Sequence, residues 1–462
     1  MKPAARILVA IAAAGVAACG APELASVSRE ADQPESTLFR DVTVFDGIDV
    51  VAHRDVIITG QTIAAVGETG THDAPSGAFH IDGAGRMLLP GLIDTHAHLV
   101  SAGEKHGGPP DEEAIGQAFL YAGVTTVLVA ASPVDLASLR GAGRADELMP
   151  HLYTAGSGLT APGGHPTSLF RAMLPWPIRW FAIRALATAA DAAEARARVD
   201  TMIDARNPEF LKIIYDDLPP GSPHLSRAAL EAAIAAARDR GVRAIVHTTT
   251  PEDTLTAVDA GASLLMHVPQ RGELSPQQTE RLAAARVPIV TTARLVSASH
   301  DLAAEGPIAL ERSMYPAELL DPWLDDPSWG LAGFSEEIDK NHDEAARVTA
   351  ANVRALLAAG AELLVGTDSG VHGVFPGASL HRELRLLVRL GMPPVEALRA
   401  ATNAPATFLD PEGRSGFGRI AVGQRADLLL VRGDPTQDIA ALAAIDGVWL
   451  AGARLTRRGV DE

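Results

Sequence analysis

The chain has almost no cysteine. Cys19 is the only one among its 462 residues, so the chain cannot form an internal disulfide, which is compatible with an extracytoplasmic protein but does not establish one. Positive charge is also scarce, because 39 lysine and arginine residues stand against 57 aspartate and glutamate residues and give a net charge of −18. Binding to nucleic acid requires a basic surface, so we expect no nucleic-acid partner.

The apolar run at the N-terminus is too short to span a bilayer and indicates a targeting segment. Two basic residues precede the run, which covers residues 7–16 and ends shortly before Cys19. The pattern resembles a bacterial lipoprotein signal, in which residues 1–18 are removed and the Cys19 thiol takes the lipid. We therefore expect residues 19–36 to be a polar tether and the protein to be lipid-anchored on the periplasmic side of a bacterial membrane, the outer membrane being favoured. An ordinary signal peptide with an incidental cysteine is the alternative.

Between residues 88 and 405, short apolar runs alternate with helical segments. Eight of these runs are predicted to be strands, at residues 88–98, 126–130, 152–155, 210–215, 243–247, 263–267, 287–291 and 362–368. Nearly continuous apolar strands are typical of a parallel sheet that is buried on both faces. Alternation of strand and helix predicts such a sheet, and eight repeats predict an α/β fold of the (β/α)8 TIM barrel type.

Strand-like segments of another kind lie on both sides of this barrel. They occur early, within residues 37–87, and again late, within residues 406–462. Turn residues such as Gly60 separate them, as expected for short antiparallel strands. We therefore predict one small β-sandwich domain that is built from both ends of the chain.

The first barrel strand ends in a pair of histidines, His96 and His98. Residues i and i+2 of a strand share one face, so both imidazoles can point to one metal ion. Barrel enzymes place their chemistry at the carboxyl ends of the strands. Four of the other strands carry further histidines or charged residues at or near their ends, namely Lys212, His247, His267 and Asp368.

Taken together, these residues and the motif Pro90-Gly91-Leu92-Ile93-Asp94-Thr95-His96-Ala97-His98 resemble the amidohydrolase superfamily. A second matching motif is Gly366-Thr367-Asp368-Ser369-Gly370. Within the superfamily, the chain is most similar to the imidazolonepropionase-like and Xaa-Pro dipeptidase-like hydrolases. It implies two divalent metal ions, for which we expect zinc. His96, His98 and Asp368 would bind the first ion, His247 and His267 the second, and a carboxylated Lys212 would bridge them. The alternative for Lys212 is a snorkelling or salt-bridged side chain.

This metal set implies a hydrolase that attacks its substrate with a metal-bridging hydroxide, with Asp368 as the proton carrier. We expect cleavage of the C–N bond of a small amide, such as a dipeptide or an N-acyl amino acid. The alternatives are a lactam, imidazolone or ester hydrolase, a mononuclear deaminase of the same fold, or a binding lipoprotein without activity. A homo-oligomer is left open.

Three further residues are candidates around the substrate. His165 follows two glycines after the third strand and is predicted to bind substrate and to donate to the developing oxyanion. Tyr215, near Lys212 in the sequence, is a second catalytic candidate for stabilising the oxyanion. Arg294, after the seventh strand, is predicted to bind a substrate carboxylate. Their alternatives are a turn histidine and a salt-bridged arginine. Two aromatic loops either line the pocket or pack beneath a loop, and they carry Trp176, Trp180, Trp323 and Trp329.

Overall fold

A computed structural model describes residues 23–30, 33–99, 112–131, 148–173, 176, 178–327, 341–371 and 373–461. Cys19, the predicted signal segment 1–18 and Trp329 lie outside these residues. Within the described part of the chain, no helix combines the length and apolar character needed to cross a membrane.

Eight parallel strands form the barrel. They are β7 (Leu92–Ala97), β8 (Val124–Val129), β9 (His151–Thr154), β12 (Phe210–Ile214), β13 (Arg243–His247), β14 (Leu264–Met266), β15 (Ile289–Val290) and β16 (Leu363–Leu364). Two backbone contacts close the ring. The Lys212 amide donates to the Ala155 carbonyl at 3.2 Å beside β9, and the Thr95 amide of β7 donates to Val365 after β16 at 3.1 Å. The predicted (β/α)8 barrel is confirmed.

Side chains alternate between the two faces of these strands. Phe210, Ile245 and Leu364 belong to a cluster that fills the barrel interior, whereas their neighbours Leu211 and Val246 pack against the surrounding helices. Both faces are apolar and buried, which explains why the strands are nearly continuous apolar runs in the sequence.

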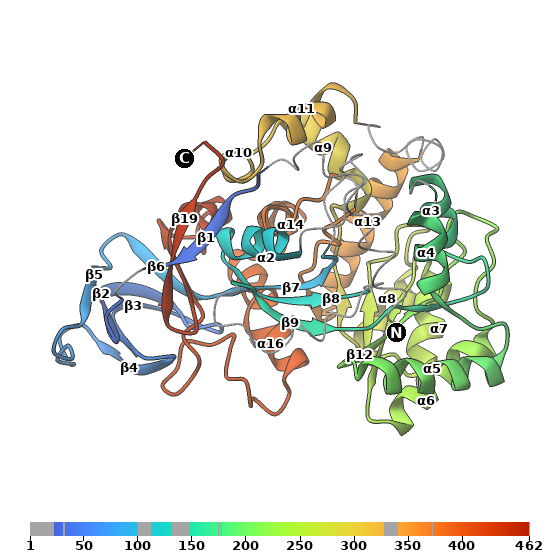
Figure 1. Ribbon diagram of the computed structural model, residues 1–462, viewed down its shortest axis with the longest axis horizontal. Coiled ribbons are helices and arrows are strands. Elements are labelled where there is room, and N and C mark those ends of the chain that lie inside the picture. The colour runs from blue at the N-terminus through green and yellow to red at the C-terminus, as the bar shows by residue number, and fades with distance from the viewer. Residues whose placement is uncertain are drawn as a thin grey trace.

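Helices follow the strands and cover the barrel (Figure 1). The main ones are α2 (Glu112–Tyr121), α5 (Ala192–Arg206), α6 (Arg227–Asp239), α7 (Pro251–Ala260), α8 (Pro276–Ala285), α13 (His342–Ala358), α14 (Ala378–Arg389), α15 (Pro394–Ala400) and α16 (Asn403–Leu409). Two excursions carry shorter helices, α3 (Thr167–Met173) and α4 (Ile178–Ala185), and α9 (Ala298–Glu305), α10 (Ala309–Met314) and α11 (Ala317–Asp325). Side-chain caps fix several starts, for example Ser226, which accepts from the Ala229 amide and begins α6.

A nine-stranded sheet lies beside the barrel, at the left of Figure 1. Its strands are β1 (Ser26–Arg29), β2 (Ser36–Phe45), β3 (Val50–Thr59), β4 (Thr62–Glu68), β5 (Phe79–Asp82), β6 (Arg86–Pro90), β17 (Leu428–Arg432), β18 (Ile445–Leu450) and β19 (Ala453–Arg458). β6 pairs with β17 in antiparallel register from Arg86 and Arg432 to Pro90 and Leu428. Both parts of the sheet share one core, to which Phe39, Leu88 and Trp449 belong. The predicted β-rich domain from both ends of the chain is therefore present.

One part of the predicted tether is wrong. Residues 26–29 form the edge strand β1, which pairs antiparallel with β19. Ala25 and Val27 are buried, so two small apolar side chains at alternate positions are enough to attach this otherwise polar segment to the sheet.

Candidate metal centre

The first group of potential ligands joins β7 to the segment after β16. The Nε2 atom of His98 lies 2.8 Å from Oδ1 of Asp368, and the Nε2 atom of His96 lies 3.3 Å from the same oxygen. The three side chains offer ligand atoms that all lie within 4.8 Å of one another. The predicted residues His96, His98 and Asp368 are thus brought together at the carboxyl end of the barrel.

Asp94 holds these two strand ends in place. Its carboxylate accepts hydrogen bonds from the amides of His96 and Thr367 and, at 2.7 Å, from the Thr367 hydroxyl. Burial raises the pKa of Asp94 to about 7, and the hydrogen bonds from Thr367 and His96 oppose this rise. Asp94 links β7 directly to the turn that presents Asp368.

The second group consists of His165, Asp216 and His247. Its ligand atoms also lie within 4.8 Å of one another. The Nε2 atom of His247 lies 2.9 Å from Asp216 Oδ2, and the His165 ring stacks on the His247 ring with centroids 5.2 Å apart. His267 joins this group to the first, because its Nε2 atom lies 2.8 Å from His247 Nδ1 and 3.9 Å from Asp368 Oδ2.

Three residues around the centre have unusual backbone angles. His267, Thr292 and Asp368 have φ values of 75°, 38° and 61°. L-residues other than glycine rarely adopt such angles, and strain of this kind concentrates at functional sites. The Thr292 hydroxyl lies 2.7 Å from Nδ1 of His267 and so fixes the ring orientation.

The carboxylates of the centre remain charged although they are buried. Burial alone would raise the pKa of Asp368, but His96 and His98 outweigh it and hold the pKa well below its usual range. Burial opposes the charge of Asp216 as well, yet the adjacent His247 and His165 lower its pKa to about 2.

Burial favours the neutral form of three histidines of the centre, His96, His165 and His267. Burial lowers the pKa of His165 to about 4, and it lowers the pKa values of His96 and His267 well below the usual value. Neutral imidazole is the form that binds metal ions.

Lys212 lies on the same face of β12 as Asp216. Only 3% of its surface is exposed. Burial lowers the pKa of its amine to about 8, although Asp368 and Asp216 oppose this shift. A lysine in this environment is partly uncharged near neutral pH.

The donor set fits a metal ion. The Nδ1 atoms of His96 and His165 and Oδ1 of Asp216 are buried and have no hydrogen-bond partner among the described residues. A buried polar atom without a partner costs about 1–3 kcal/mol, which coordination of a cation offsets. Neutral imidazole nitrogens and carboxylate oxygens are the usual ligands of zinc and similar ions.

Asp216 is not among the site residues predicted from the sequence, whereas Tyr215 is. Successive residues of β12 alternate between faces, so Lys212 and Asp216 share the side of the metal centre and Tyr215 has the opposite side. Tyr215 packs in the core between barrel and helices and its ring lies 5.3 Å from His224. The catalytic role of Tyr215 therefore stays a prediction, and the alternation along the chain places Asp216 on the side of the metal centre.

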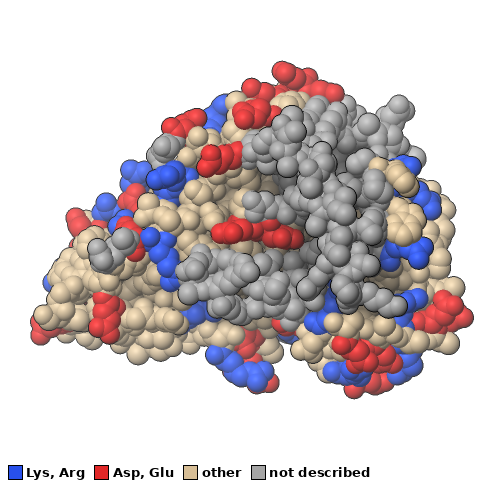
Figure 2. Space-filling model, in the orientation of Figure 1, with Lys and Arg blue, Asp and Glu red and all other residues tan. Residues whose placement is uncertain are grey.

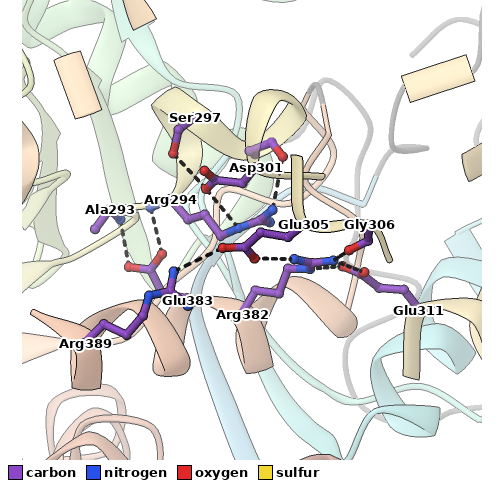
Figure 3. Close-up of polar contacts among 11 residues, drawn as sticks. Ala293, Arg294, Ser297, Asp301, Glu305, Gly306, Glu311, Arg382, Glu383 and Arg389 are labelled. Carbon is purple, nitrogen blue, oxygen red and sulfur yellow. Dashed lines mark hydrogen bonds and ion pairs between the residues drawn. The ribbon is translucent and has the colours of Figure 1, made fainter. Parts of the chain in front are cut away.

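Arg294 is engaged with other residues of the chain. Only 5% of its surface is exposed, and its side chain lies in a network of charged residues (Figure 3). There Nε lies 3.4 Å from Asp301 and the guanidinium donates to the Ala298 carbonyl at 3.1 Å. Burial lowers the pKa of Arg294 to about 10, and Arg382 adds to this effect. The salt-bridged alternative describes these contacts, and the binding of a substrate carboxylate by Arg294 stays a prediction.

The tryptophans separate into two environments. Trp323 is fully buried, whereas Trp176 and Trp180 are 72% and 48% exposed. The packing alternative therefore applies to Trp323.

Comparison with known proteins gives the family. The chain matches the amidohydrolase family over residues 87–455. It belongs to this family. An imidazolonepropionase from Rubrobacter xylanophilus is 27% identical over 414 residues, which cover 83% of this chain and 86% of the relative.

Two solved structures share the amidohydrolase fold with this chain. A Xaa-Pro dipeptidase with bound methionine is 22% identical, with a TM-score of 0.69 and coverage of 91% of this chain and 99% of that chain. A prolidase complexed with N-methylphosphonate-L-proline is 22% identical, with a TM-score of 0.72 and coverage of 92% and 100%. The chain is an amidohydrolase that acts on C–N bonds, and this family generally uses divalent metal ions.

Proposed function

We propose that this amidohydrolase cleaves the amide bond of a small substrate, such as a dipeptide or an N-acyl amino acid, with two divalent metal ions. The observation that carries the proposal is the meeting of two groups of histidine and carboxylate side chains at one end of the barrel. His96, His98 and Asp368 would hold one ion, and His247 and His267 the other. Zinc suits this set of nitrogen and oxygen donors.

Lys212 supports a site with two ions. Because the pKa of its amine is lowered to about 8, a fraction of the amine is neutral near neutral pH. A neutral amine can react with carbon dioxide to form a carbamate, with loss of one proton, and the two carbamate oxygens can serve two ions. Carboxylated Lys212 would then bridge the two groups.

The side chains of the centre have complementary roles. When bound, the ions would polarise the scissile carbonyl and make a nearby water more acidic. Asp368 is held as a carboxylate, so it can accept a proton from the attacking water and pass it to the leaving nitrogen. His165 is neutral and beside the second group, where its ring N–H can donate to the developing oxyanion.

Metal content and Lys212 test the proposal together. We expect about two equivalents of zinc in the purified protein and a clear loss of metal in Lys212→Ala. Linear dipeptides and N-acyl amino acids should be hydrolysed faster than their cyclic lactam counterparts. One equivalent of metal that does not change in Lys212→Ala would contradict the two-ion site and favour a mononuclear enzyme.

A lactam or imidazolone hydrolase is the second candidate function. It is favoured by the similarity to an imidazolonepropionase over most of both chains. This function would be favoured over the amidase if the protein hydrolysed cyclic lactams faster than linear dipeptides and if Lys212→Ala bound as much metal as the parent.

We also propose that the protein is a lipoprotein anchored through Cys19. The support is the apolar run that precedes this single cysteine. Cys19→Ser should release the protein from sedimented membranes after a high-salt wash, because the lipid anchor is lost and salt screens any remaining charge contacts. Retention of the variant after a high-salt wash would show that Cys19 is not the anchor.

A further inference from the structure

The α3–α4 excursion has a surface that differs from the rest of the molecule. We define the α3–α4 surface as Arg171, Trp176, Arg179, Trp180 and Arg184, all of which are exposed. The two tryptophans are among the few large apolar side chains that are exposed in the described part of the chain. Exposed tryptophan and arginine on one short excursion are typical of a surface that contacts something else.

The charge of this region is opposite to that of the whole chain. Residues 148–190 contain no aspartate or glutamate, although acidic residues outnumber basic ones in the chain by 57 to 39. The space-filling view shows blue among tan atoms over α3 and α4, at the right of the molecule (Figure 2). An apolar and locally positive patch on a negative protein is complementary to an anionic partner.

A cavity of ≈ 190 Å³ lies next to this surface, between α4 and α5. Three arginines line it, together with the polar residues Ser157 and Thr201. The arginines are Arg184, Arg198 and Arg206. Arginine donors are suited to phosphate and carboxylate oxygens.

Two of the three cavity arginines, Arg184 and Arg198, make their recorded contacts with uncharged groups of the described residues. Within the described residues, no carboxylate lies within 4.0 Å of the guanidinium of Arg184 or of Arg198. Arg184 lies 4.7 Å from the centroid of the Trp180 ring, and Arg198 donates to the Thr188 carbonyl at 3.3 Å. The acidic residues Asp200 and Asp204 of α5 are engaged with Arg240 of α6 instead.

We propose that the α3–α4 surface and the arginine cavity form a docking site for an anionic phospholipid surface. The tryptophan rings would enter the headgroup layer, where aromatic side chains with a polar atom are favoured. The exposed arginines would face the lipid phosphates, one of which would enter the cavity. Arg184 belongs to both parts and connects them. This docking does not depend on Cys19, so it would orient the enzyme on a membrane whatever holds the N-terminus.

Vesicle flotation tests the proposal. All described strands and helices begin at or after Ser26, so we expect a chain starting at Glu23 to keep the fold without the N-terminal apolar run. We expect this protein to float with vesicles of phosphatidylglycerol and phosphatidylcholine in about equal amounts, and not with phosphatidylcholine alone. Raised salt should release it, because salt screens exposed charges.

Two variants locate the contact. Arg184→Gln with Arg198→Gln should weaken partitioning about 30-fold, since each arginine near an anionic surface contributes on the order of a fivefold factor. Trp176→Ala with Trp180→Ala should also weaken it, and the tryptophan emission of the parent should shift to shorter wavelength on binding. The matched control is Arg414→Gln with Val422→Ala, which removes one exposed arginine and one exposed apolar side chain from elsewhere.

Several results would overturn the proposal. The first is that the parent protein does not float with the anionic vesicles. The second is that the control variant loses as much vesicle binding as the two test variants. A third result concerns a soluble anion. If inorganic phosphate raised the unfolding temperature of the parent but not of the Arg198 variant, and no protein bound vesicles, the cavity would be a site for a soluble anion instead. The unfolding temperature of each variant should be close to that of the parent, which would exclude loss of the fold as the cause of weaker vesicle binding.

Discussion

At the end of β12, Asp216 faces the metal centre two positions beyond Ile214, on the same side of the strand as Lys212. It contacts His247 with one carboxylate oxygen, and its other oxygen has no hydrogen-bond partner among the described residues. A carboxylate in this position can either bind a metal ion or orient the histidine that does.

Asp216→Asn should therefore weaken zinc retention or kcat/KM by about 10- to 100-fold. The amide keeps the shape of the side chain but removes its charge. Metal analysis after dialysis and steady-state kinetics would measure the two effects. The neighbouring Asp217→Asn is the matched control, because Asp217 is paired with Arg271 at 2.6 Å. If zinc retention and kcat/KM fell equally in both variants, Asp216 would have no specific role in the metal centre.

Asp368→Asn should abolish turnover while the protein stays folded. Asp368 is the carboxylate that meets both histidines of the first group, and its charge is what accepts the proton. Kinetics and circular dichroism would be compared with the parent. Activity within about tenfold of the parent would exclude Asp368 from proton transfer, since loss of a general base costs about 10²–10⁴-fold.

A site residue can be predicted from the sequence when residues next to it in the chain determine where its side chain points. His96 and His98 follow from the alternation of one strand. The same rule, continued past the end of β12, places Asp216 on the face of Lys212 and Tyr215 on the other face. The direction of Arg294 has no such local cause. It is set by α9 and α14, and Glu383 of α14 lies 89 positions away in the sequence.

At the level of elements, α14 shapes the turn after β15. The Glu383 carboxylate is buried and accepts from the Thr291 hydroxyl at 2.6 Å and from the amides of Ala293 and Arg294 at 2.7 and 2.9 Å. These bonds hold the turn in which Thr292 has its unusual φ and contacts His267. α14 therefore supports a histidine of the centre without touching it.

Glu383→Gln should destabilise the protein by about 1–3 kcal/mol, because one of three buried donors would face an amide NH2 group. It should also weaken metal retention, through Thr292 and His267. Urea unfolding and metal analysis would measure these changes. Glu305→Gln on α9 is the control, since the Glu305 side chain is half exposed. If both variants unfold at the same urea concentration as the parent, Glu383 does not hold the turn.

The barrel strands could be predicted because both of their faces are buried, which leaves a run of apolar residues. β1 could not, because only one of the four residues of this edge strand, Val27, is buried and the other three are polar. The pairing partner of each terminal strand also depends on residues at the opposite end of the chain.

For the molecule as a whole, buried histidines make stability depend on pH. His381 of α14 is buried against the end of α2 and contacts the Ala122 carbonyl through Nε2 at 2.9 Å. Burial lowers its pKa from 6.5 to about 4. Between these values the unfolded chain binds a proton at this position and the folded chain does not, so protons favour unfolding.

The free energy of unfolding should therefore fall as the pH drops from 6.5 to 4, by on the order of 3 kcal/mol for His381. His381→Gln keeps a donor for the Ala122 carbonyl and should remove that share of the slope. Urea unfolding across this pH range would show it. His80→Gln, at an exposed histidine of β5, should leave the slope unchanged. An unchanged slope in His381→Gln would assign the pH dependence to other groups.

The pairing of β6 with β17 has a consequence for protein synthesis. β6 leaves the ribosome long before its partner, which is near the end of the chain. A nonsense mutation between Asp368 and Leu428 would produce a polypeptide that contains every candidate metal ligand. It would nevertheless leave the edge of β6 open and expose Met87, Leu88 and Leu89, which the complete sheet buries. Because an open apolar edge recruits strands from other chains, such a product is expected to precipitate in the cell before it can act as a shortened enzyme.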